Sequence, residues 1–142
     1  MILLDTHILV WSVTDDTRRL PGSVMDAIDA AMAKREASVS AATFWELALK
    51  RRMFRDILPS LPPPADLHTA VLGAGLVEIP VSGSLWIEAV ELTDDRFHTD
   101  PADQLIVATA IRFGHELFTR DDRILSWARR TQRVELYDDG AG

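Results

Sequence analysis

Cysteine is absent from this sequence of 142 residues. Its absence excludes disulfide bonds, thiolate metal sites and a cysteine nucleophile, and it is compatible with a reducing cytoplasm. The sequence also lacks an apolar run long enough to span a membrane, and its first residues lack the basic region of a signal peptide. We therefore expect a soluble, cytoplasmic protein with no membrane partner.

Positive charge is scarce as well. Lys and Arg number 15 against 22 Asp and Glu, which gives a formal net charge of −7. This balance argues against broad, sequence-independent binding of nucleic acid by charge alone, so a polyanion would need a local basic patch or a metal ion. The densest basic run contains Lys50, Arg51, Arg52 and Arg55. It fits either a solvated helix end or a flank that binds phosphate.

Short apolar segments alternate with helical patterns along the chain. Strands are expected at residues 2–4, 37–40, 77–81 and 117–119, with a possible last strand at 134–137. Such alternation is typical of an α/β domain with a central, mainly parallel sheet of four to five strands and helices on both faces. The length suits one domain over residues 1–137, with a frayed tail at 138–142. Four prolines between residues 59 and 64 predict a stiff connection, followed by a helix from Asp66.

A helix expected at residues 100–113 is too apolar to lie at the periphery. Asp100 can cap this helix, Pro101 suits its first position, and Asp103 falls in its first turn. Few strongly polar residues follow, so the helix should be buried over most of its surface. Ordinary helix-start chemistry can explain both acids, and they suggest a site only if other acids reach the same place.

Three further acids follow expected strands. Asp5 comes after the first strand, Glu46 after the second and Asp121 after the fourth. Because the carboxyl ends of parallel strands share one edge of a sheet, these acids should lie at that edge. Asp103 must be brought there by the orientation of its helix.

Each of these acids also has a structural explanation. Asp5 can act as a helix cap, and Glu46 can complete a capping box with Thr43 or pair with Lys50 one turn later. His7 has no second histidine one turn away, and we interpret it as structural.

Four carboxylates in one place need compensation, because like charges raise one another's pKa. Either some of the groups stay protonated or a cation lies among them. A site of carboxylate oxygens without His or Cys suits Mg²⁺ or Mn²⁺ better than Zn²⁺. Such an ion can accept phosphate oxygens and make a water acidic enough to attack phosphorus.

Four segments, taken in order, resemble the successive motifs of PIN-domain ribonucleases and, more narrowly, of the VapC-type toxins of bacterial toxin–antitoxin pairs. They are Leu-Leu-Asp-Thr-His at residues 3–7, Ser-Ala-Ala-Thr-Phe-Trp-Glu-Leu-Ala-Leu-Lys at 40–50, Asp-Pro-Ala-Asp-Gln-Leu-Ile-Val-Ala at 100–108 and Leu-Phe-Thr-Arg-Asp at 117–121. The similarity extends to about Asp122. It implies a PIN-like, three-layer α/β/α domain.

The resemblance also implies an activity, that of a Mg²⁺- or Mn²⁺-dependent endoribonuclease toxin that hydrolyses RNA phosphodiester bonds with a metal-activated water. Asp5 and Asp103 would be the principal metal ligands, Glu46 a ligand or a positioner of the water, and Asp121 a more distant ligand or a ligand of a second ion. Thr119 would orient the carboxylates.

Two pairs of neighbours compete for these roles. Asp100 is the alternative to Asp103, and Asp122 is the alternative to Asp121. Among the basic residues, Lys50, Arg51 and Arg52 are the candidates for binding RNA.

The partners implied by the resemblance are an RNA substrate, a second copy of the chain and a cognate antitoxin whose peptide lies over the acidic groove. Trp11, Trp45, Met53 and Phe54 can help to form such a groove, although core packing is the simpler role for the two Trp residues. Two other functions remain open. One is a PIN-like module that only binds a partner, and the other is a phosphotransfer domain with Asp5 as a covalent nucleophile.

Overall fold

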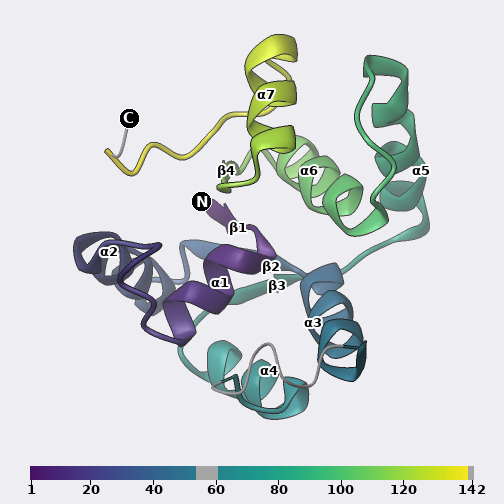
Figure 1. Cartoon of the computed structure of the whole chain (residues 1–142). Coiled ribbons are helices and arrows are strands. Elements are labelled where there is room, and N and C mark those ends of the chain that lie inside the picture. The colour runs from purple at the N-terminus through teal and green to yellow at the C-terminus, as the bar shows by residue number, and fades with distance from the viewer. Residues whose placement is uncertain (54–60, 141–142) are drawn as a thin grey trace.

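A four-stranded parallel sheet forms the centre of the protein in a computed structural model that describes residues 1–53 and 61–140. The strands are β1 (Ile2–Leu4), β2 (Ala37–Ser40), β3 (Val77–Ile79) and β4 (Glu116–Phe118), in the order β3-β2-β1-β4. β1 lies between β2 and β4, and in its register Leu3 is opposite Leu117. Figure 1 shows the sheet between two groups of helices.

The first group of helices covers one face of the sheet. It comprises α1 (Thr6–Val13), α2 (Gly22–Ala33), α3 (Ala41–Met53) and α4 (Pro64–Gly73). Alternate strand residues point toward this group, so Leu4, Val39 and Phe118 share one apolar cluster with Ile8 and Leu47. This cluster is the first of two cores.

The second group covers the opposite face. It comprises α5 (Gly83–Glu91), the short 3-10 helix η1 (Leu92–Asp95), α6 (Pro101–Phe113) and α7 (Asp122–Thr131). The neighbouring strand residues Leu3, Ile79 and Leu117 pack against it. The fold is therefore the three-layer α/β/α arrangement that the alternating sequence pattern predicts.

Helix α6 is the buried helix expected from the sequence. Its residues 102–110 are all buried, and it packs against α5, α3, β2 and β4. Asp100 caps it by accepting a hydrogen bond from the backbone N–H of Asp103 at 3.0 Å. Gly114 ends it in the left-handed conformation, with φ of 65°. Asp100 and Gly114 thus mark the two ends of α6.

Two strand predictions need correction. Residues 134–137 do not form a fifth strand, because Leu136 makes only an isolated parallel bridge to Leu117. β3 ends at Ile79 rather than at residue 81, since Pro80 has no N–H to continue the ladder.

Two helix predictions also need correction. α4 begins at Pro64 rather than at Asp66, with the proline in the first turn, where its missing N–H costs nothing. The capping box of Thr43 with Glu46 is wrong, because α3 begins at Ala41 and the Ser40 hydroxyl accepts the N–H of Ala42 at 3.1 Å.

Some expectations fall outside the described part of the chain. Phe54, Arg55 and Pro59 lie there, as do residues 141–142 of the tail. Within the tail, Asp139 lies against Arg120 in an ion pair. Across residues 1–53 and 61–140, no helix combines the length and the hydropathy that crossing a bilayer requires.

Candidate active site

Asp5 lies at the carboxyl end of β1 and caps α1. Its Oδ1 accepts the N–H of Thr6 at 2.8 Å, and its Oδ2 accepts the Thr119 hydroxyl at 2.6 Å. The residue is only 2 % exposed. The carboxylate is thus held in one orientation by donors from two different segments.

Thr119 connects Asp5 to the start of α7. While it donates to Asp5, its hydroxyl oxygen accepts the N–H of Asp121 at 3.0 Å. Asp121 caps α7, because its Oδ1 accepts the N–H groups of Arg123 and Ile124 at 2.9 and 3.0 Å. Asp122, the next residue, is exposed. The cluster of acids described below includes Asp121, and nothing places Asp122 in it.

Asp103 is the residue on which the other acids converge. Its pKa is raised to about 7, first by burial and then by the negative charges of the neighbouring acids Asp5, Asp100, Asp121 and Glu46. These five acids, which we call the acid cluster, come from the ends of β1 and β4, from α3 and from the start of α6. The orientation of α6 therefore does bring Asp103 to the edge where the strands end.

Three members of the acid cluster can share a cation. Ligand oxygens of Glu46, Asp100 and Asp103 lie within 4.8 Å of one another. Asp100 is thus grouped with Asp103, and one side chain can serve both as helix cap and as candidate ligand. The donors are carboxylate oxygens alone, which is the chemistry that Mg²⁺ and Mn²⁺ prefer.

Two basic side chains approach the acid cluster. The Lys50 ammonium lies 3.4 Å from Glu46 Oε2, the i to i+4 pair that the sequence predicts. The Arg123 guanidinium lies 3.6 Å from Asp103 Oδ2 and 3.9 Å from Asp121 Oδ1. Arg51 and Arg52 are exposed in the last turn of α3.

Comparison with known proteins identifies the family. The sequence model of the family described as PIN domain matches residues 2–130 of this chain. The chain belongs to the PIN domain family. A relative from Mycobacterium tuberculosis, named Ribonuclease VapC22, is 34 % identical over 125 residues, which are 88 % of this chain and 90 % of the relative. The resemblance to VapC-type PIN domains is thereby confirmed.

Solved structures share the fold at lower identity. The VapBC2 complex of Rickettsia felis, bound to a DNA fragment from its promoter, contains a chain that matches with a TM-score of 0.66 at 20 % identity, covering 96 % of this PIN domain and 98 % of that chain. FitAcB from Neisseria gonorrhoeae matches with a TM-score of 0.57 at 20 % identity, covering 96 % of both chains. A toxin–antitoxin complex from Klebsiella pneumoniae matches with a TM-score of 0.57 at 21 % identity, covering 85 % of this chain and 87 % of that chain.

Two histidines border the acid cluster of this PIN domain. His7 Nε2 accepts the N–H of Arg120 at 3.0 Å, and its Nδ1 lies 3.5 Å from Asp5 Oδ2. Since Nε2 is an acceptor, we assign the proton to Nδ1, where it faces the carboxylate. His7 therefore joins the β4–α7 loop to the Asp5 segment, a structural role.

His98 is a neighbour of the site that the sequence patterns missed. Its Nδ1 accepts the N–H of Asp100 at 3.3 Å, and its Nε2 lies 3.3 Å from Asp103 Oδ2. Burial lowers the pKa of His98, and the positive charge of Arg123 lowers it further. A neutral ring thus lies beside Asp103. Its position two residues before the cap of α6 was the available signal.

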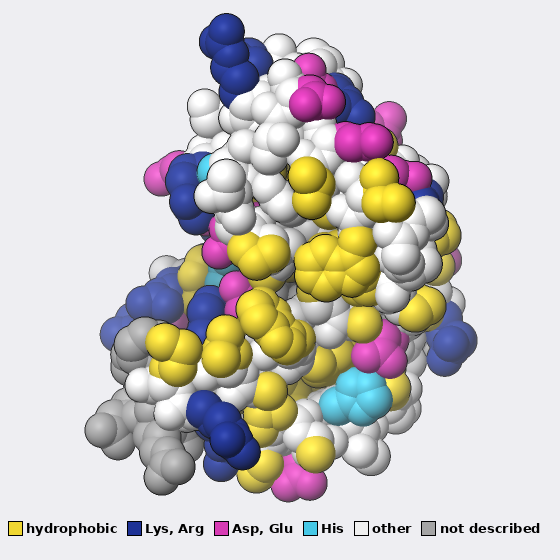
Figure 2. All heavy atoms as spheres, turned by 90° about the vertical axis from the view of Figure 1, so that its right-hand side faces the viewer, with side chains coloured by type: hydrophobic (Ala, Val, Ile, Leu, Met, Phe, Trp, Pro, Cys, Tyr) yellow, Lys and Arg dark blue, Asp and Glu magenta, His cyan; other side chains and the backbone are white. Residues whose placement is uncertain are grey.

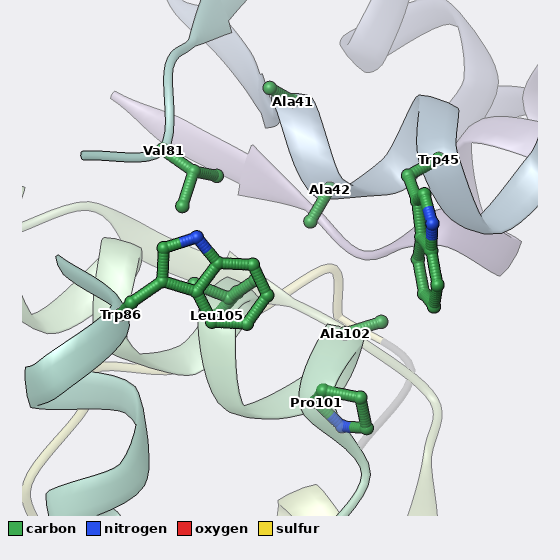
Figure 3. A pocket seen from close by; sticks show the side chains of 8 residues that line it. All are labelled: Ala41, Ala42, Trp45, Val81, Trp86, Pro101, Ala102 and Leu105. Atoms are coloured by element: carbon green, nitrogen blue, oxygen red, sulfur yellow. The ribbon is translucent and has the colours of Figure 1, made fainter. Parts of the chain in front are cut away.

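An apolar pocket adjoins the acid cluster. It has a volume of about 420 Å³ and is shown in Figure 3. Its lining residues are Ala41, Ala42, Trp45, Val81, Trp86, Pro101, Ala102 and Leu105. Trp45 is next to Glu46 in α3, and Pro101 is next to Asp100 in α6, so the pocket and the acid cluster share two helix starts.

The expected core role of Trp45 is wrong. Its side chain flanks the mouth of the pocket and the residue is 55 % exposed, whereas Trp11 is partly buried against the first core as expected. Figure 2 shows hydrophobic side chains gathered on the face formed by α3 and α5. This exposed apolar face, which we call the α3/α5 face, includes Trp45, Trp86, Ile87 and Val90. Such a face on a small protein indicates a surface for a partner.

Proposed function

We propose that this PIN domain is a divalent-metal-dependent endoribonuclease and the toxin of a toxin–antitoxin pair. The observation that carries the proposal is the acid cluster, in which Asp103 is surrounded by four other carboxyl groups and has a pKa near 7. A relative of the same family is named a ribonuclease, and chains with the same fold occur in toxin–antitoxin complexes. Together these findings favour a metal-dependent nuclease over a domain whose acids serve only as caps.

The residues of the cluster fit a divalent ion. Asp5 and Asp103 would be its principal ligands. Glu46 and Asp100 lie close enough to Asp103 to join them, and Asp121 would complete the site or hold a second ion. A bound Mg²⁺ or Mn²⁺ supplies Lewis acidity toward an RNA phosphate and balances the crowded negative charge. The raised pKa of Asp103 supports this fit, because burial and the four neighbouring acids disfavour its ionised form, which a bound cation would stabilise.

The chain's own residues orient and polarise the reactants. Thr119 and the N–H of Thr6 hold the Asp5 carboxylate, so its ligand oxygens need not reorganise during the reaction. Glu46, which pairs with Lys50, would accept a proton from the water that attacks phosphorus. The bond from phosphorus to the leaving ribose oxygen would break, and that oxygen would take up a proton from solvent.

The test is cleavage of structured RNA with Mg²⁺ or Mn²⁺ present. Asp5→Asn and Asp103→Asn should each lower the rate by more than about 100-fold, since even a residue that merely supports a metal ligand is worth 10- to 100-fold. Asp103→Asn should unfold at the same temperature as the wild type or higher, because it removes one crowded charge. Asp122→Asn is the matched control and should cleave normally. A variant at Asp5 or Asp103 that cleaves at the wild-type rate would contradict the assignment of that residue.

Metal binding separates the alternatives. A nuclease should bind Mn²⁺ in a way that Asp5→Asn and Asp103→Asn weaken, whereas a pure interaction module should have no such site. A phosphotransfer domain would instead carry phosphate covalently on Asp5, which intact-mass measurement detects.

We further propose that the α3/α5 face is where a second copy binds. A two-fold dimer uses the same patch on both subunits, so the patch must be self-complementary, as a patch with both a protrusion and a hollow can be. This face has both, because Trp86, Ile87 and Val90 project from α5 beside the apolar pocket. The contact would lie against the helix starts that hold Glu46 and Asp100.

Sedimentation of Trp86→Glu tests the dimer. This variant should be monomeric at concentrations where the wild type is dimeric, because a buried charge at the contact would be unpaired. Phe113→Glu is the matched control, since Phe113 is 49 % and Trp86 48 % exposed, and it should not change the mass. A wild type that is monomeric at every concentration would leave the face to a different partner.

We propose that a cognate antitoxin covers the acidic groove; chains with the same fold do occur in toxin–antitoxin complexes. Of the residues expected to form this groove, Met53 is exposed on α3 and Trp11 is partly buried on α1. Co-expression of the cognate antitoxin should suppress RNA cleavage.

A further inference from the structure

Arg123 occupies an unusual place for a cation. It is the second residue of α7, whose cap is Asp121. The N-terminus of a helix carries partial positive charge, so an arginine in the first turn is disfavoured by the helix dipole. Arg129 and Arg130 lie in the last turn of the same helix, where the dipole favours them. Helix stability therefore does not explain why a cation is found at position 123.

The main chain of Arg123 is held firmly, whereas its guanidinium is held only by loose ion pairs. Its backbone N–H is bound to Asp121 Oδ1 at 2.9 Å, which holds the main chain beside the acid cluster. Its guanidinium lies 3.6 Å from Asp103 and 3.9 Å from Asp121, distances of loose ion pairs, and the side chain is 62 % exposed. Exposed pairs of this kind are weak and readily exchanged.

The guanidinium and a divalent ion would compete for the same carboxylates. Both are attracted by Asp103 and Asp121, and a doubly charged ion with several carboxylate ligands prevails over a loose ion pair. Once the ion neutralises the acids, the attraction that holds the guanidinium falls. The planar fork of an arginine then suits the phosphate that such an ion attracts, because its parallel N–H groups match two phosphate oxygens.

We propose that Arg123 is a phosphate-binding residue that exchanges partners, pairing with Asp103 and Asp121 in the metal-free protein and with an RNA phosphate when a divalent ion is bound. This inference rests on the proposed function and adds a substrate-binding residue to it. Lys50 is less suited to the role, since its ammonium pairs with Glu46 and lacks the fork geometry.

The exchange predicts opposite effects of Arg123→Ala on two measurements. Mn²⁺ affinity should rise about 2- to 5-fold, the range expected when a weak competing ion pair is removed. RNA cleavage at saturating Mn²⁺ should fall about 10- to 100-fold in kcat/KM, because a charge-assisted contact to phosphate is lost. Arg123→Lys should keep the competition with Mn²⁺ but recover only part of the cleavage. A merely structural role would lower both quantities together.

The experiment measures Mn²⁺ binding by electron paramagnetic resonance at constant ionic strength, and RNA cleavage on the same full-length proteins. Arg129→Ala, at the far end of α7, is the matched control and should change neither quantity. Unchanged or weaker Mn²⁺ binding by Arg123→Ala, or undiminished cleavage, would overturn the exchange while leaving the nuclease proposal in place. A wild type that binds no Mn²⁺ would overturn the proposed function, and this inference with it.

Discussion

Asp103 lies in the first turn of a helix, is buried, and has four other acids around it. In the folded protein its pKa is about 7, against an ordinary value of 3.8. Burial is the main cause, and the four neighbouring acids add to it. The folded protein therefore binds a proton at Asp103 more tightly than the unfolded chain does.

This raised pKa predicts how metal-free stability depends on pH. The contribution of Asp103 is complete below its unfolded pKa of 3.8 and is lost as the pH rises through about 7. In EDTA, the melting temperature of Asp103→Asn relative to the wild type should therefore increase between pH 5 and pH 8. Asp26→Asn, at an exposed acid on α2, should show no such trend. Parallel melting profiles of the wild type and Asp103→Asn would contradict the raised pKa.

The Thr119 hydroxyl connects Asp5 and Asp121 through two hydrogen bonds. Thr119→Val leaves Asp5 Oδ2 without its hydroxyl donor and the N–H of Asp121 without its acceptor, so the free energy of unfolding should fall by about 1–3 kcal/mol. Mn²⁺ affinity should fall about 10- to 100-fold, as is usual when a ligand loses its supporting hydrogen bond. Calorimetry measures both quantities.

Thr109→Val is the control for Thr119→Val. Thr109 is also buried. Its hydroxyl donates to the backbone carbonyl of Leu105 within α6, and not to a carboxylate of the acid cluster. It should leave Mn²⁺ affinity unchanged. Equal affinity in Thr119→Val and the wild type would show that Thr119 does not orient the ligand.

At the scale of elements, the start of α6 combines cap and candidate ligand in Asp100. Asp100→Ala should lower the free energy of unfolding by about 1 kcal/mol, whereas Asp100→Ser should not, because serine also caps helices. Both variants should weaken Mn²⁺ binding equally, since neither retains the carboxylate. Wild-type Mn²⁺ affinity in Asp100→Ser would mean that Asp100 is a cap alone and that Asp103 is the ligand from α6.

Local patterns predict the elements that are themselves local. The four strands and the buried α6 follow from short apolar runs and from cap and glycine positions, and the acids at strand ends follow from parallel topology. The sequence treats Asp100 and Asp103 as alternatives, because capping and metal ligation use the same residue type. Only the fold shows that their oxygens lie close together.

Other features depend on packing that no local pattern encodes. Trp45 is exposed because α3 lies between two cores, with Ala42 in one and Leu47 in the other, which leaves part of its apolar surface uncovered. His98 lies in a loop without periodicity, so its closeness in sequence to the α6 cap is a weak signal, and its contact with Asp103 shows that it borders the site. Arg123 is likewise recognised by the acids it meets rather than by its sequence.

At the scale of the whole molecule, a net charge of −7 must be reconciled with the proposed RNA substrate. A divalent ion in the acid cluster and exposed Arg51 and Arg52 on α3 would offer local positive charge, while Lys50 is engaged with Glu46. Arg51→Ala combined with Arg52→Ala should weaken RNA binding. The slope of the logarithm of the RNA-binding constant against the logarithm of the salt concentration should become less steep by about 1.4, or 0.7 for each lost phosphate contact.

The control for the basic run is a second exposed pair. Lys34 and Arg35 precede β2 and therefore lie at the opposite edge of the sheet. Their replacement by Ala should alter the slope much less, as measured by filter binding over a range of salt concentrations. An unchanged slope in the variant that lacks Arg51 and Arg52 would show that this basic run is only a solvated helix end.

We propose that five acids from separate parts of the chain hold one or two divalent ions at the place where RNA is cut. Anomalous diffraction from crystals grown with Mn²⁺ would locate such ions. We predict a peak within coordination distance of Asp103 and Asp5, with Glu46 or Asp100 completing the ligands. Crystals grown at saturating Mn²⁺ that show no anomalous peak among these carboxylates would contradict the proposed metal site.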